Sequence, residues 1–269
     1  MLKKICYLGE NKDFSDRWLI KQLKCNFDVI LVSPGDKKRI ADSDYIINRL
    51  YASVYERYKK EDVSNLLNEF KRKKGSYIIN SLGGFFLECD RIKQNIFFKS
   101  NGLSFAPTIL LEDLKKDKKS LLFPVLLKNN NSGRNKTLKV INSYSDLVEE
   151  PVFNDKKQVA QSLVNDEICY RTEFIGDKTL TFPQNVRIRG DRLEFNVITE
   201  IIKAPLAFQK VKQIRSILKK IGVQSFSIEY FLVKNKEVIV DYNLSSNYKC
   251  FLIKEKGSLI RSAWLELLN

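Results

Sequence analysis

The feature that most constrains this chain is a predicted β-hairpin between residues 228 and 248. Two short runs rich in β-branched and aromatic residues flank a Lys-Asn-Lys turn at 234–236, a pattern typical of two antiparallel strands. Because side chains alternate between the two faces of a strand, Asp241 and Asn243 point to the same face. An antiparallel return can bring Glu229 near them. The hairpin therefore predicts three oxygen-bearing side chains at one place in a sheet.

Such a set of oxygen donors suits Mg²⁺, a hard ion that proteins usually hold by one or two carboxylates together with substrate phosphates. The alternative is a solvated edge hairpin whose carboxylates are ordinary surface charges. Taken alone, the segment favours this second interpretation, so the rest of the chain has to decide between the two.

The chain contains no histidine among its 269 residues. This excludes Ser-His-Asp and Cys-His nucleophilic catalysis and histidine-based metal sites within the chain. Any chemistry must use carboxylates, Lys and Arg, amides and backbone groups. Phosphoryl transfer suits that set, because positioning and electrostatic stabilisation carry most of its catalysis.

The formal net charge is +15, from 47 Lys and Arg against 32 Asp and Glu. A field of this size favours polyanionic partners such as nucleotides, nucleic acids or acidic peptides. Many of the lysines fall in short runs near expected helix ends and loops, which are more often solvated surface than a nucleic-acid footprint. No zinc-finger or RNA-recognition motif accompanies them, so the sequence argues against nucleic acid as the partner.

The 43% hydrophobic content is enough for a sizeable core. No apolar run reaches the length of a membrane span, and the apolar part of the N-terminus is too short for a signal peptide. We therefore expect a cytoplasmic protein that does not enter a membrane. The five cysteines are scattered without metal-ligand spacing, which predicts reduced thiols and no zinc site.

Strand and helix patterns alternate in the first third of the chain. Strands are expected at 5–9, 27–32, 45–47 and 77–81, the last closed by Gly83-Gly84, and helices at 16–24 and 53–70. This order predicts an open, mostly parallel sheet that ends near residue 85. The first strand is not followed by the glycine pattern of a dinucleotide-binding turn, so that interpretation is poor.

The remaining two thirds mix strands and helices. A helix at 90–100 has Asn101-Gly102 as its C-cap, and an amphipathic helix at 208–221 is capped by Gly222. The other expected elements are an extended stretch at 105–111, strands at 121–128, 137–141, 156–164, 167–174 and 179–182, a basic turn at 187–192, and a helix at 258–268.

Short motifs run in order through most of the chain. They are Asp44-Tyr-Ile-Ile-Asn48-Arg49, Asn80-Ser81 with Asp90-Arg91, Gly102-Leu-Ser-Phe-Ala-Pro107-Thr108, Phe123-Pro-Val-Leu-Leu-Lys128, Gln161-Ser-Leu-Val164, Tyr170-Arg171-Thr-Glu-Phe-Ile-Gly-Asp-Lys178, and Gly222 followed by Glu229 and Asp241-Tyr-Asn243. Each is weak alone. Together, at these spacings, they resemble the ATP-grasp superfamily, in particular its RimK-type carboxylate–amine ligases.

The resemblance implies an α/β (α+β) protein with the ATP-grasp fold and an N-terminal Rossmann-like pre-ATP-grasp domain. The expected divisions are an N-terminal domain at 1–88, a linking helix and core segment at 89–120, a small lid-like subdomain at 121–164, and a C-terminal subdomain with the metal site at 165–269. A homo-oligomer is compatible with this arrangement.

The resemblance also implies an enzyme, an ADP-forming ligase that joins a carboxylate to an amine, of a peptide or amino acid, through an acyl phosphate. ATP and Mg²⁺ would be its cofactors, with Mn²⁺ as an alternative ion. The substrates would be a small-molecule or peptide carboxylate and amine, and the positive field favours acidic ones. Two other functions stay open: a catalytically weakened ATP-grasp protein that binds nucleotide or peptide, and a basic nucleic-acid-binding protein.

Roles for single residues follow from the resemblance. Arg171 and Arg187 would stabilise charge on the transferring phosphoryl group. The cofactor would be bound by Arg91 and Lys128 at the phosphates, Ser132 and Gly133 in the phosphate loop, Gln161, Ser162, Leu163 and Val164 at the adenine hinge, and Glu167 at the ribose. Glu229, Asp241 and Asn243 would hold the metal. The plainer alternatives are a rim lysine for Lys128, a loop carboxylate for Glu167 and salt-bridged strand residues for the two arginines.

The chain departs from the family pattern at several of these positions. Glu229 stands where the family usually has Asp, and Asp241 where it usually has Glu, so the two carboxylates exchange side-chain lengths. Arg91 occupies the position of a family Lys, which keeps the charge and alters the geometry. Gly133 is the one glycine in a loop that usually has several, and fewer glycines reduce close backbone approach to phosphates. Reduced activity, or binding without catalysis, is the alternative that this difference leaves open.

Overall fold

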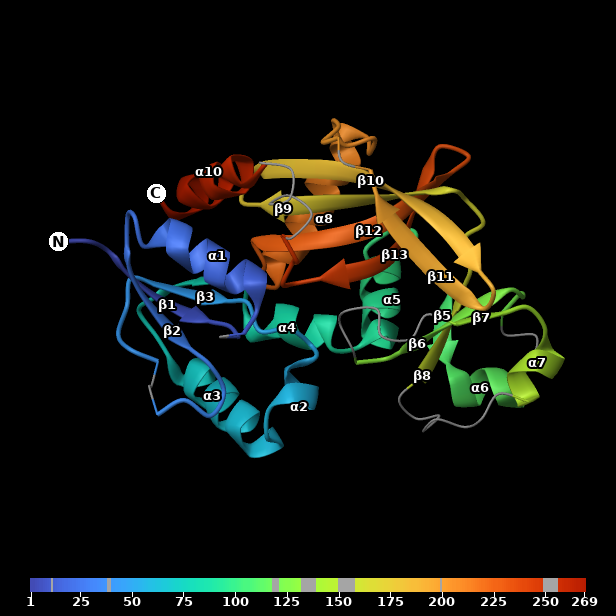
Figure 1. The fold of residues 1–269 in the computed structure, drawn as a ribbon, viewed down its shortest axis with the longest axis horizontal. Coiled ribbons are helices and arrows are strands. Elements are labelled where there is room, and N and C mark those ends of the chain that lie inside the picture. Colours follow the sequence, from blue (N-terminus) through green and yellow to red (C-terminus); the bar gives the residue numbers. More distant parts are fainter. Residues whose placement is uncertain are drawn as a thin grey trace.

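Four parallel strands form the N-terminal sheet, in the order β2-β1-β3-β4 (Figure 1). They are β1 (Lys4–Leu8), β2 (Asp28–Val32), β3 (Tyr45–Asn48) and β4 (Tyr77–Ile79). Side chains of β1 alternate between two helices: Ile5 and Tyr7 share a core with α1 (Phe14–Leu23), and Cys6 and Leu8 share one with α3 (Lys60–Arg72). The expected open parallel sheet is confirmed, with α1 on one face and α3 on the other.

The computed structural model describes residues 1–10, 12–37, 40–117, 121–131, 139–149, 158–198, 200–248 and 256–269. Within these ranges, none of the helices combines the length and the hydropathy that crossing a membrane requires. The division of the chain into domains at 88, 120 and 164 remains a prediction.

Two expectations for the N-terminal third are wrong in detail. The helix expected at 53–70 is two helices, α2 (Val54–Arg57) and α3, because the backbone at Tyr58 is extended. Gly83 and Gly84 do not end a strand but belong to α4 (Leu82–Glu88), whose N-cap is Ser81. A Cβ at Gly84 would overlap Val223 Cγ2, so the close packing of α4 there requires glycine.

A second, nine-stranded sheet has the order β13-β12-β9-β10-β11-β7-β6-β8-β5, and the neighbouring strands whose register is resolved are antiparallel. The larger part consists of β9 (Ile168–Ile175), β10 (Lys178–Arg189), β11 (Arg192–Val197), β12 (Ser225–Val233) and β13 (Lys236–Asn243). A small lobe is built from β5 (Thr108–Leu110), β6 (Val125–Asn129), β7 (Lys139–Ile141) and β8 (Gln158–Ser162), with α6 (Leu111–Lys116) and α7 (Tyr144–Glu149). The two parts meet where Arg192 of β11 pairs with Lys139 of β7.

The basic turn expected at 187–192 is also wrong. Strand β10 continues to Arg189, β11 begins at Arg192, and only the two residues between them turn, with Gly190 at φ +60°. Figure 1 shows this ribbon reaching from the large part of the sheet towards β7. Helices α6 and α7 were not expected from the sequence either.

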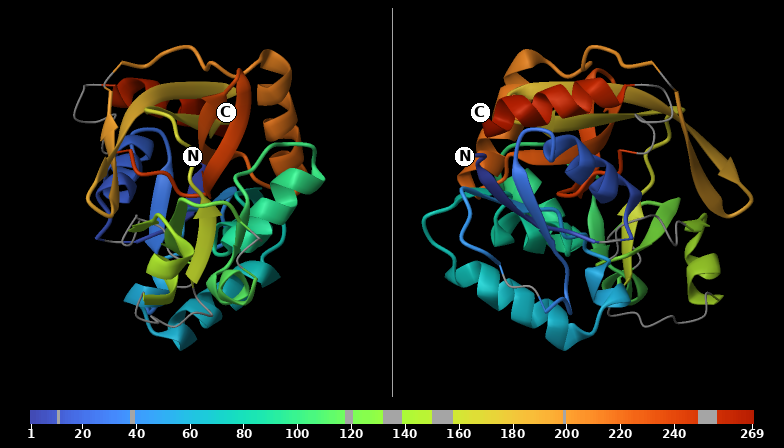
Figure 2. Two further views of the ribbon diagram at one scale, coloured as in Figure 1. Left: turned by 90° about the vertical axis from the view of Figure 1, so that its right-hand side faces the viewer. Right: turned by 60° about the vertical axis from the view of Figure 1, so that its left-hand side comes forward.

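Helices take part in a core that both sheets share. The helices α4, α5 (Arg91–Ser100) and α8 (Phe208–Lys220) contribute to a core that contains Phe98, Phe174 and Phe226, and the last two rings stack at 4.5 Å. The C-terminal helix α10 (Gly257–Leu268) lies beside α1, as Figure 2 shows, and its Trp264 is fully buried there. The N-terminal sheet and the C-terminal half of the chain therefore share one continuous interior.

Candidate functional site

The predicted hairpin is present and brings its three polar side chains together. Strands β12 and β13 turn at Lys234 and Asn235, both with positive φ. Glu229 pairs with Asp241 across the two strands, and Asn243 lies two residues further along β13. Glu229 is 8% exposed and Asp241 is 7% exposed. The alternative of a solvated hairpin with surface carboxylates is therefore wrong.

Both carboxylates face a guanidinium group. Arg91, the first residue of α5, forms an ion pair through Nη1 with Asp241 Oδ1. Arg171 of β9 lies opposite Glu229 in the sheet, and its Nη1 is 3.3 Å from Glu229 Oε1. The Nε of Arg171 is 2.9 Å from Oε1 of Glu173, a third buried carboxylate. Arg171 is thus an ion-paired strand residue, but its side chain is only 13% exposed and lies at the hairpin, not on an exposed face.

Lys128, near the end of β6, reaches the same place from the small lobe. Its Nζ donates to Gln161 Oε1 at 2.7 Å and to the Val240 carbonyl at 3.4 Å. Gln161 Nε2 donates to the same carbonyl at 3.2 Å and to Thr108 Oγ1 at 3.0 Å. Lys128 is 7% exposed, so the alternative of a rim lysine is wrong. These bonds connect β6 and β8 of the small lobe to β13 of the large part.

Burial shifts the pKa values of two groups in this cluster. It lowers the pKa of Lys128 to about 8, and the nearby Arg91 adds to the effect while Asp241 and Glu229 oppose it. Burial raises the pKa of Glu229, against the attraction of Arg171. In each case burial is the largest cause, and the opposite charges nearby partly offset it.

The donor set fits a hard divalent ion. Two carboxylates and an amide oxygen are ligand types that Mg²⁺ accepts, with phosphate oxygens completing the shell. Among the residues described, no group of three or more His, Cys, Asp or Glu side chains is placed to hold a metal. A site built on Glu229 and Asp241 would therefore depend on Asn243 and on a bound phosphate.

The predicted adenine hinge at 161–164 begins with the last two residues of β8, and part of its backbone is already bonded. The Ser162 N–H donates to the Pro107 carbonyl at 2.9 Å, and the Leu163 N–H donates to the Pro124 carbonyl at 3.2 Å. The Val164 N–H has no backbone partner among the residues that the structure describes, and its role at the adenine stays a prediction. Leu163 and Val164 both pack against apolar side chains, which suits the face of a base.

The remaining predicted residues lie outside this cluster or outside the described residues. Glu167 is exposed before β9, and its carbonyl accepts from the Val186 N–H at 2.8 Å. Arg187 is exposed on the β10–β11 ribbon, opposite Glu194. Ser132 and Gly133 fall outside the described residues. The roles assigned to these four residues stay predictions.

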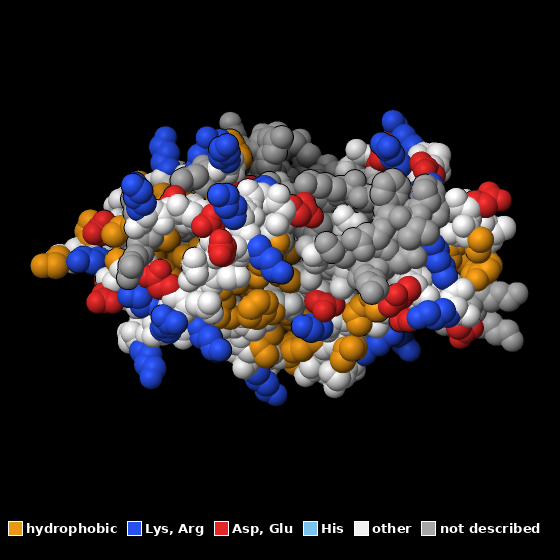
Figure 3. Space-filling model, turned by 90° about the horizontal axis from the view of Figure 1, so that it is seen from below, with side chains coloured by type: hydrophobic (Ala, Val, Ile, Leu, Met, Phe, Trp, Pro, Cys, Tyr) orange, Lys and Arg blue, Asp and Glu red, His pale blue; other side chains and the backbone are white. Residues whose placement is uncertain are grey.

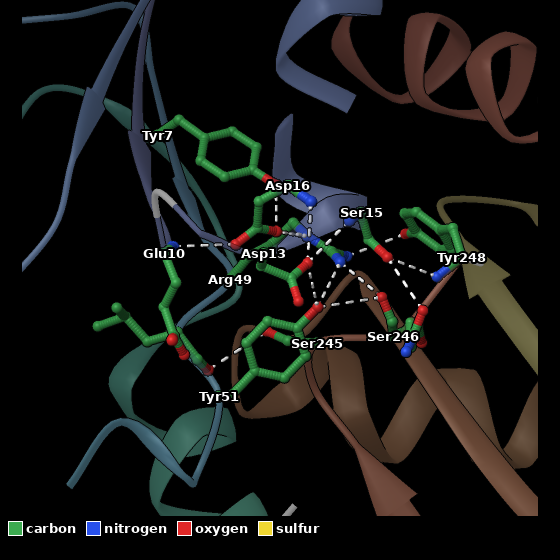
Figure 4. Close-up of polar contacts among 12 residues, drawn as sticks. Tyr7, Glu10, Asp13, Ser15, Asp16, Arg49, Tyr51, Ser245, Ser246 and Tyr248 are labelled. Atoms are coloured by element: carbon green, nitrogen blue, oxygen red, sulfur yellow. Dashed lines mark hydrogen bonds and ion pairs between the residues drawn. The ribbon is translucent and has the colours of Figure 1, made fainter. Parts of the chain in front are cut away.

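A second buried polar cluster was not foreseen as a unit (Figure 4). Arg49 follows β3 and is fully buried with Asp16, 3.1 Å from Nε to Oδ1. Its Nη1 donates to the Tyr248 hydroxyl at 3.0 Å and its Nη2 to the Ser246 carbonyl at 2.6 Å. Tyr7 of β1 donates its hydroxyl to Asp16 at 2.8 Å. The cluster fixes the segment after β13 against the carboxyl ends of β1 and β3.

The sequence contained a signal for only one member of this cluster. Arg49 closes the motif that begins at Asp44, but its partners are 33 and 199 positions away. No local pattern joins residues at such distances. A buried arginine after a parallel strand requires a buried acid, and Asp16 in the first turn of α1 supplies it.

No family model matches the chain. A curated relative, the uncharacterized protein MG011 of Mycoplasma genitalium, is 22% identical over 231 residues, which cover 83% of this chain and 75% of the relative.

Solved structures align over nearly the whole chain. The macrocyclase MdnC bound with precursor peptide MdnA, from Microcystis aeruginosa MRC, has a TM-score of 0.70 at 12% identity and covers 98% of this chain and 99% of its own. The ATP-grasp ligase PsnB complexed with minimal precursor, Mg and ADP has a TM-score of 0.68 at 13% identity, covering 98% and 97%. A RimK domain ATP-grasp protein of Sphaerobacter thermophilus DSM 20745 has a TM-score of 0.65 at 13% identity, covering 98% of both chains. The chain therefore has the ATP-grasp fold.

Proposed function

We propose that this protein is an ATP-dependent ligase that joins a carboxylate to an amine and releases ADP, through an acyl-phosphate intermediate. One observation carries the proposal: Lys128, Arg91 and Arg171 are gathered with Glu229 and Asp241 at the junction of the small lobe with β12 and β13. Three cations can bind the phosphates of a nucleotide, and two carboxylates can bind its metal.

Within this proposal each residue of the cluster has a distinct role in binding or catalysis. Lys128 and Arg91 would bind phosphate oxygens, Arg91 in a two-pronged way that Lys cannot imitate. Glu229, Asp241 and Asn243 would hold Mg²⁺, which supplies charge neutralisation between the phosphates when bound. Arg171 would stabilise the charge that develops on the transferring phosphoryl group.

Other assignments belong to the same proposal. Val164 and the neighbouring hinge residues from Gln161 would bind adenine, Glu167 the ribose, and Ser132 and Gly133 the phosphates, while Arg187 would reach the acyl phosphate from the β10–β11 ribbon.

A peptide or amino acid is the substrate class that we propose. MdnC and PsnB are each described in complex with a precursor, which supports a peptide for this chain as well. The charge distribution does not favour nucleic acid. On the face seen in Figure 3, Lys and Arg side chains are scattered among Asp and Glu and do not form one continuous stripe.

The test begins with nucleotide binding. Isothermal titration with a non-hydrolysable ATP analogue and Mg²⁺ should show binding, and ADP release should then be screened with pairs of carboxylates and amines. Asp241→Ala and Asn243→Ala should abolish ADP release. Glu237→Ala is the matched control, because Glu237 is a buried, ion-paired carboxylate of the same strand that pairs with Lys210 and lies outside the cluster.

Two outcomes would contradict the proposal. Full turnover in the Asp241 and Asn243 variants would show that the metal assignment is wrong. Binding of the analogue without ADP release for any pair would favour the weakened, binding-only protein instead, an alternative that gains weight because guanidinium groups already occupy both metal carboxylates.

A further inference from the structure

The charges of the cluster balance without any ligand. Lys128, Arg91 and Arg171 supply three positive charges, and Asp241, Glu229 and Glu173 supply three negative ones. All six side chains are buried or nearly so. A divalent cation alone would add two positive charges beside three cations, and a free triphosphate would add about four negative charges beside three carboxylates. Adding either ligand alone has a high electrostatic free-energy cost in a buried site. When both bind, their charges largely cancel and the cost falls.

Arg91 occupies one of the two Asp241 oxygens that a metal could bind. It pairs with Asp241 Oδ1, while Asp241 Oδ2 lies 3.5 Å from the amide nitrogen of Asn243. A metal that binds Oδ1 therefore has to displace Arg91, and at either oxygen the nearby guanidinium charge opposes a divalent ion. Breaking a buried ion pair is expensive unless the charge that is released finds another partner.

The phosphates of a bound nucleotide can be that partner, because of where Arg91 lies. Its Nε donates to the Asn129 carbonyl at 3.1 Å, and its backbone N–H donates to Asn130 Oδ1 at 2.9 Å. Asn129 ends β6, the strand that leads into the predicted phosphate loop. Arg91 thus lies between the metal ligand on β13 and the side from which phosphates would approach.

Arg171 is placed differently. It lies in the middle of β9 between two carboxylates, Glu173 and Glu229, so losing one of them leaves the other to neutralise it. It can remain in place when the metal enters. Arg91 is therefore the residue whose movement can connect the two binding events.

We infer that Arg91 couples metal and nucleotide binding: its pairing with Asp241 keeps a divalent ion out until a polyphosphate draws the guanidinium away. The inference rests on the proposed function, because it takes Asp241 as a metal ligand. The coupling is reciprocal, since a nucleotide that improves metal affinity must have its own affinity improved by the metal to the same degree. Couplings of this kind typically change affinity by about 5- to 150-fold.

The experiment uses the full chain and two separate titrations. Mn²⁺ alone is titrated and the free ion followed by electron paramagnetic resonance. A fluorescent non-hydrolysable ATP analogue is titrated once in EDTA and once with saturating Mn²⁺. The variants are Arg91→Gln, Arg91→Lys and, as a matched control, Lys93→Gln, which removes a positive charge from an exposed position of the same helix. Circular dichroism checks that each variant is folded.

The wild-type chain should bind Mn²⁺ alone weakly and the analogue at least about fivefold more tightly with Mn²⁺ than in EDTA. Arg91→Gln should have opposite effects on the two ligands: Mn²⁺ alone binds at least about fivefold more tightly, the analogue binds more weakly, and the coupling shrinks. Arg91→Lys keeps the positive charge, so it should bind Mn²⁺ alone as weakly as the wild type while binding the analogue less tightly, and Lys93→Gln should leave the coupling unchanged. If Arg91→Gln is unfolded, Arg91→Met, which also removes the charge and keeps more of the side chain's length, takes its place in both titrations.

The inference is overturned if the wild-type affinity for the analogue is the same with and without Mn²⁺. It is equally overturned if Arg91→Gln binds Mn²⁺ alone no better than Lys93→Gln does. If the wild-type chain binds no analogue at all, the proposed function fails, and the comparison of Mn²⁺ alone still decides whether Arg91 blocks the metal carboxylates.

Discussion

Lys128 allows the buried cluster to be tested by pH alone. Its ammonium group is buried, and this burial lowers its pKa to about 8. Below that pH the group is charged and can bind phosphate oxygens; above it the group is neutral and cannot. If only the charged form binds nucleotide, the apparent dissociation constant rises by a factor of one plus ten to the power of pH minus pKa. That factor is about 2 at pH 8 and about 11 at pH 9.

The assay is a titration of a fluorescent, non-hydrolysable ATP analogue with Mg²⁺ between about pH 7 and pH 9.5. We expect the wild-type affinity to fall with a slope that approaches about tenfold per pH unit. The Lys128→Arg variant should give a flat profile, because guanidinium keeps its proton throughout this range. Its absolute affinity can differ, since an arginine fork meets phosphates with another geometry, so the slope and not the affinity is the observable.

Two results would refute this reasoning. The first is tight binding by the wild-type chain with no change from pH 7 to pH 9.5, because Lys128 would then carry no part of the affinity. The second is a parallel fall in wild type and Lys128→Arg, which would place the titrating group elsewhere. Lys210→Arg is a suitable control for the exchange itself, since Lys210 pairs with Glu237 on the outer part of β13.

Three further predictions concern stability and are measured by urea unfolding. Gly84→Ala should lower the free energy of unfolding by about 1–3 kcal/mol through overpacking, whereas Gly83→Ala, with ordinary contact distances in the same helix, should cost nothing. Arg49→Met should cost about 3–5 kcal/mol because Asp16 is left buried and unpaired, and adding Asp16→Asn should recover part of the loss. Burial raises the pKa of Glu88 to about 8. The folded state therefore favours the protonated carboxyl group. This contribution to the free energy of unfolding is complete below the ordinary carboxyl pKa and is lost as pH rises towards 8, by up to about 1.4 kcal/mol per pH unit. Glu88→Gln should flatten that slope, because the amide does not titrate.

Each of these predictions has a contradicting result. Equal losses for the two alanine variants would mean that the α4 contact is loose. An unchanged loss after Asp16→Asn would mean that the cost of removing Arg49 comes from packing and not from charge. Parallel pH curves for wild type and Glu88→Gln between pH 5 and pH 8 would assign the slope to other groups.

Local chemistry explains what the sequence predicted well. The alternation along β13 placed Asp241 and Asn243 on one face, and the return of β12 placed Glu229 opposite, as the register confirms. The helix after Asp90 was predictable because its N-cap and its C-terminal glycine are both short-range signals; the Asp90 side chain accepts from two backbone amides of the first turn.

The prediction of helices and strands failed where the local sequence signal was ambiguous. The β10–β11 ribbon is exposed at its tip, so residues from Arg187 to Arg192 lack the alternation of buried and exposed side chains that indicates a strand. The Gly83-Gly84 pair has the composition of a turn, and only the cap at Ser81 and the close contact of Gly84 with Val223 make it helical.

The site's electrostatics could not be predicted, because they depend on distant pairs. Arg91 and Asp241 are 150 positions apart, and Lys128 is 33 positions from Gln161. The sequence showed residues that can bind phosphate and metal, but not that the two sets neutralise each other. That fact appears only when α5, β6, β9 and β13 are assembled.

The seam between β11 and β7 has a mechanical consequence. Among the residues described, the two strands meet through the pair Arg192 and Lys139, supported by a bond from the Val140 amide to the Asp191 carbonyl at 2.7 Å. A seam this short yields at little cost, whereas the ladder between β12 and β13 does not. The small lobe is also tied to β13 by Lys128 and Gln161, which both donate to the Val240 carbonyl, so these two bonds have to break before the lobe can move away from β13. Because Lys128 belongs to the buried charge cluster, the rate at which nucleotide enters and leaves would depend both on the short β11–β7 seam and on how firmly the cluster holds Lys128.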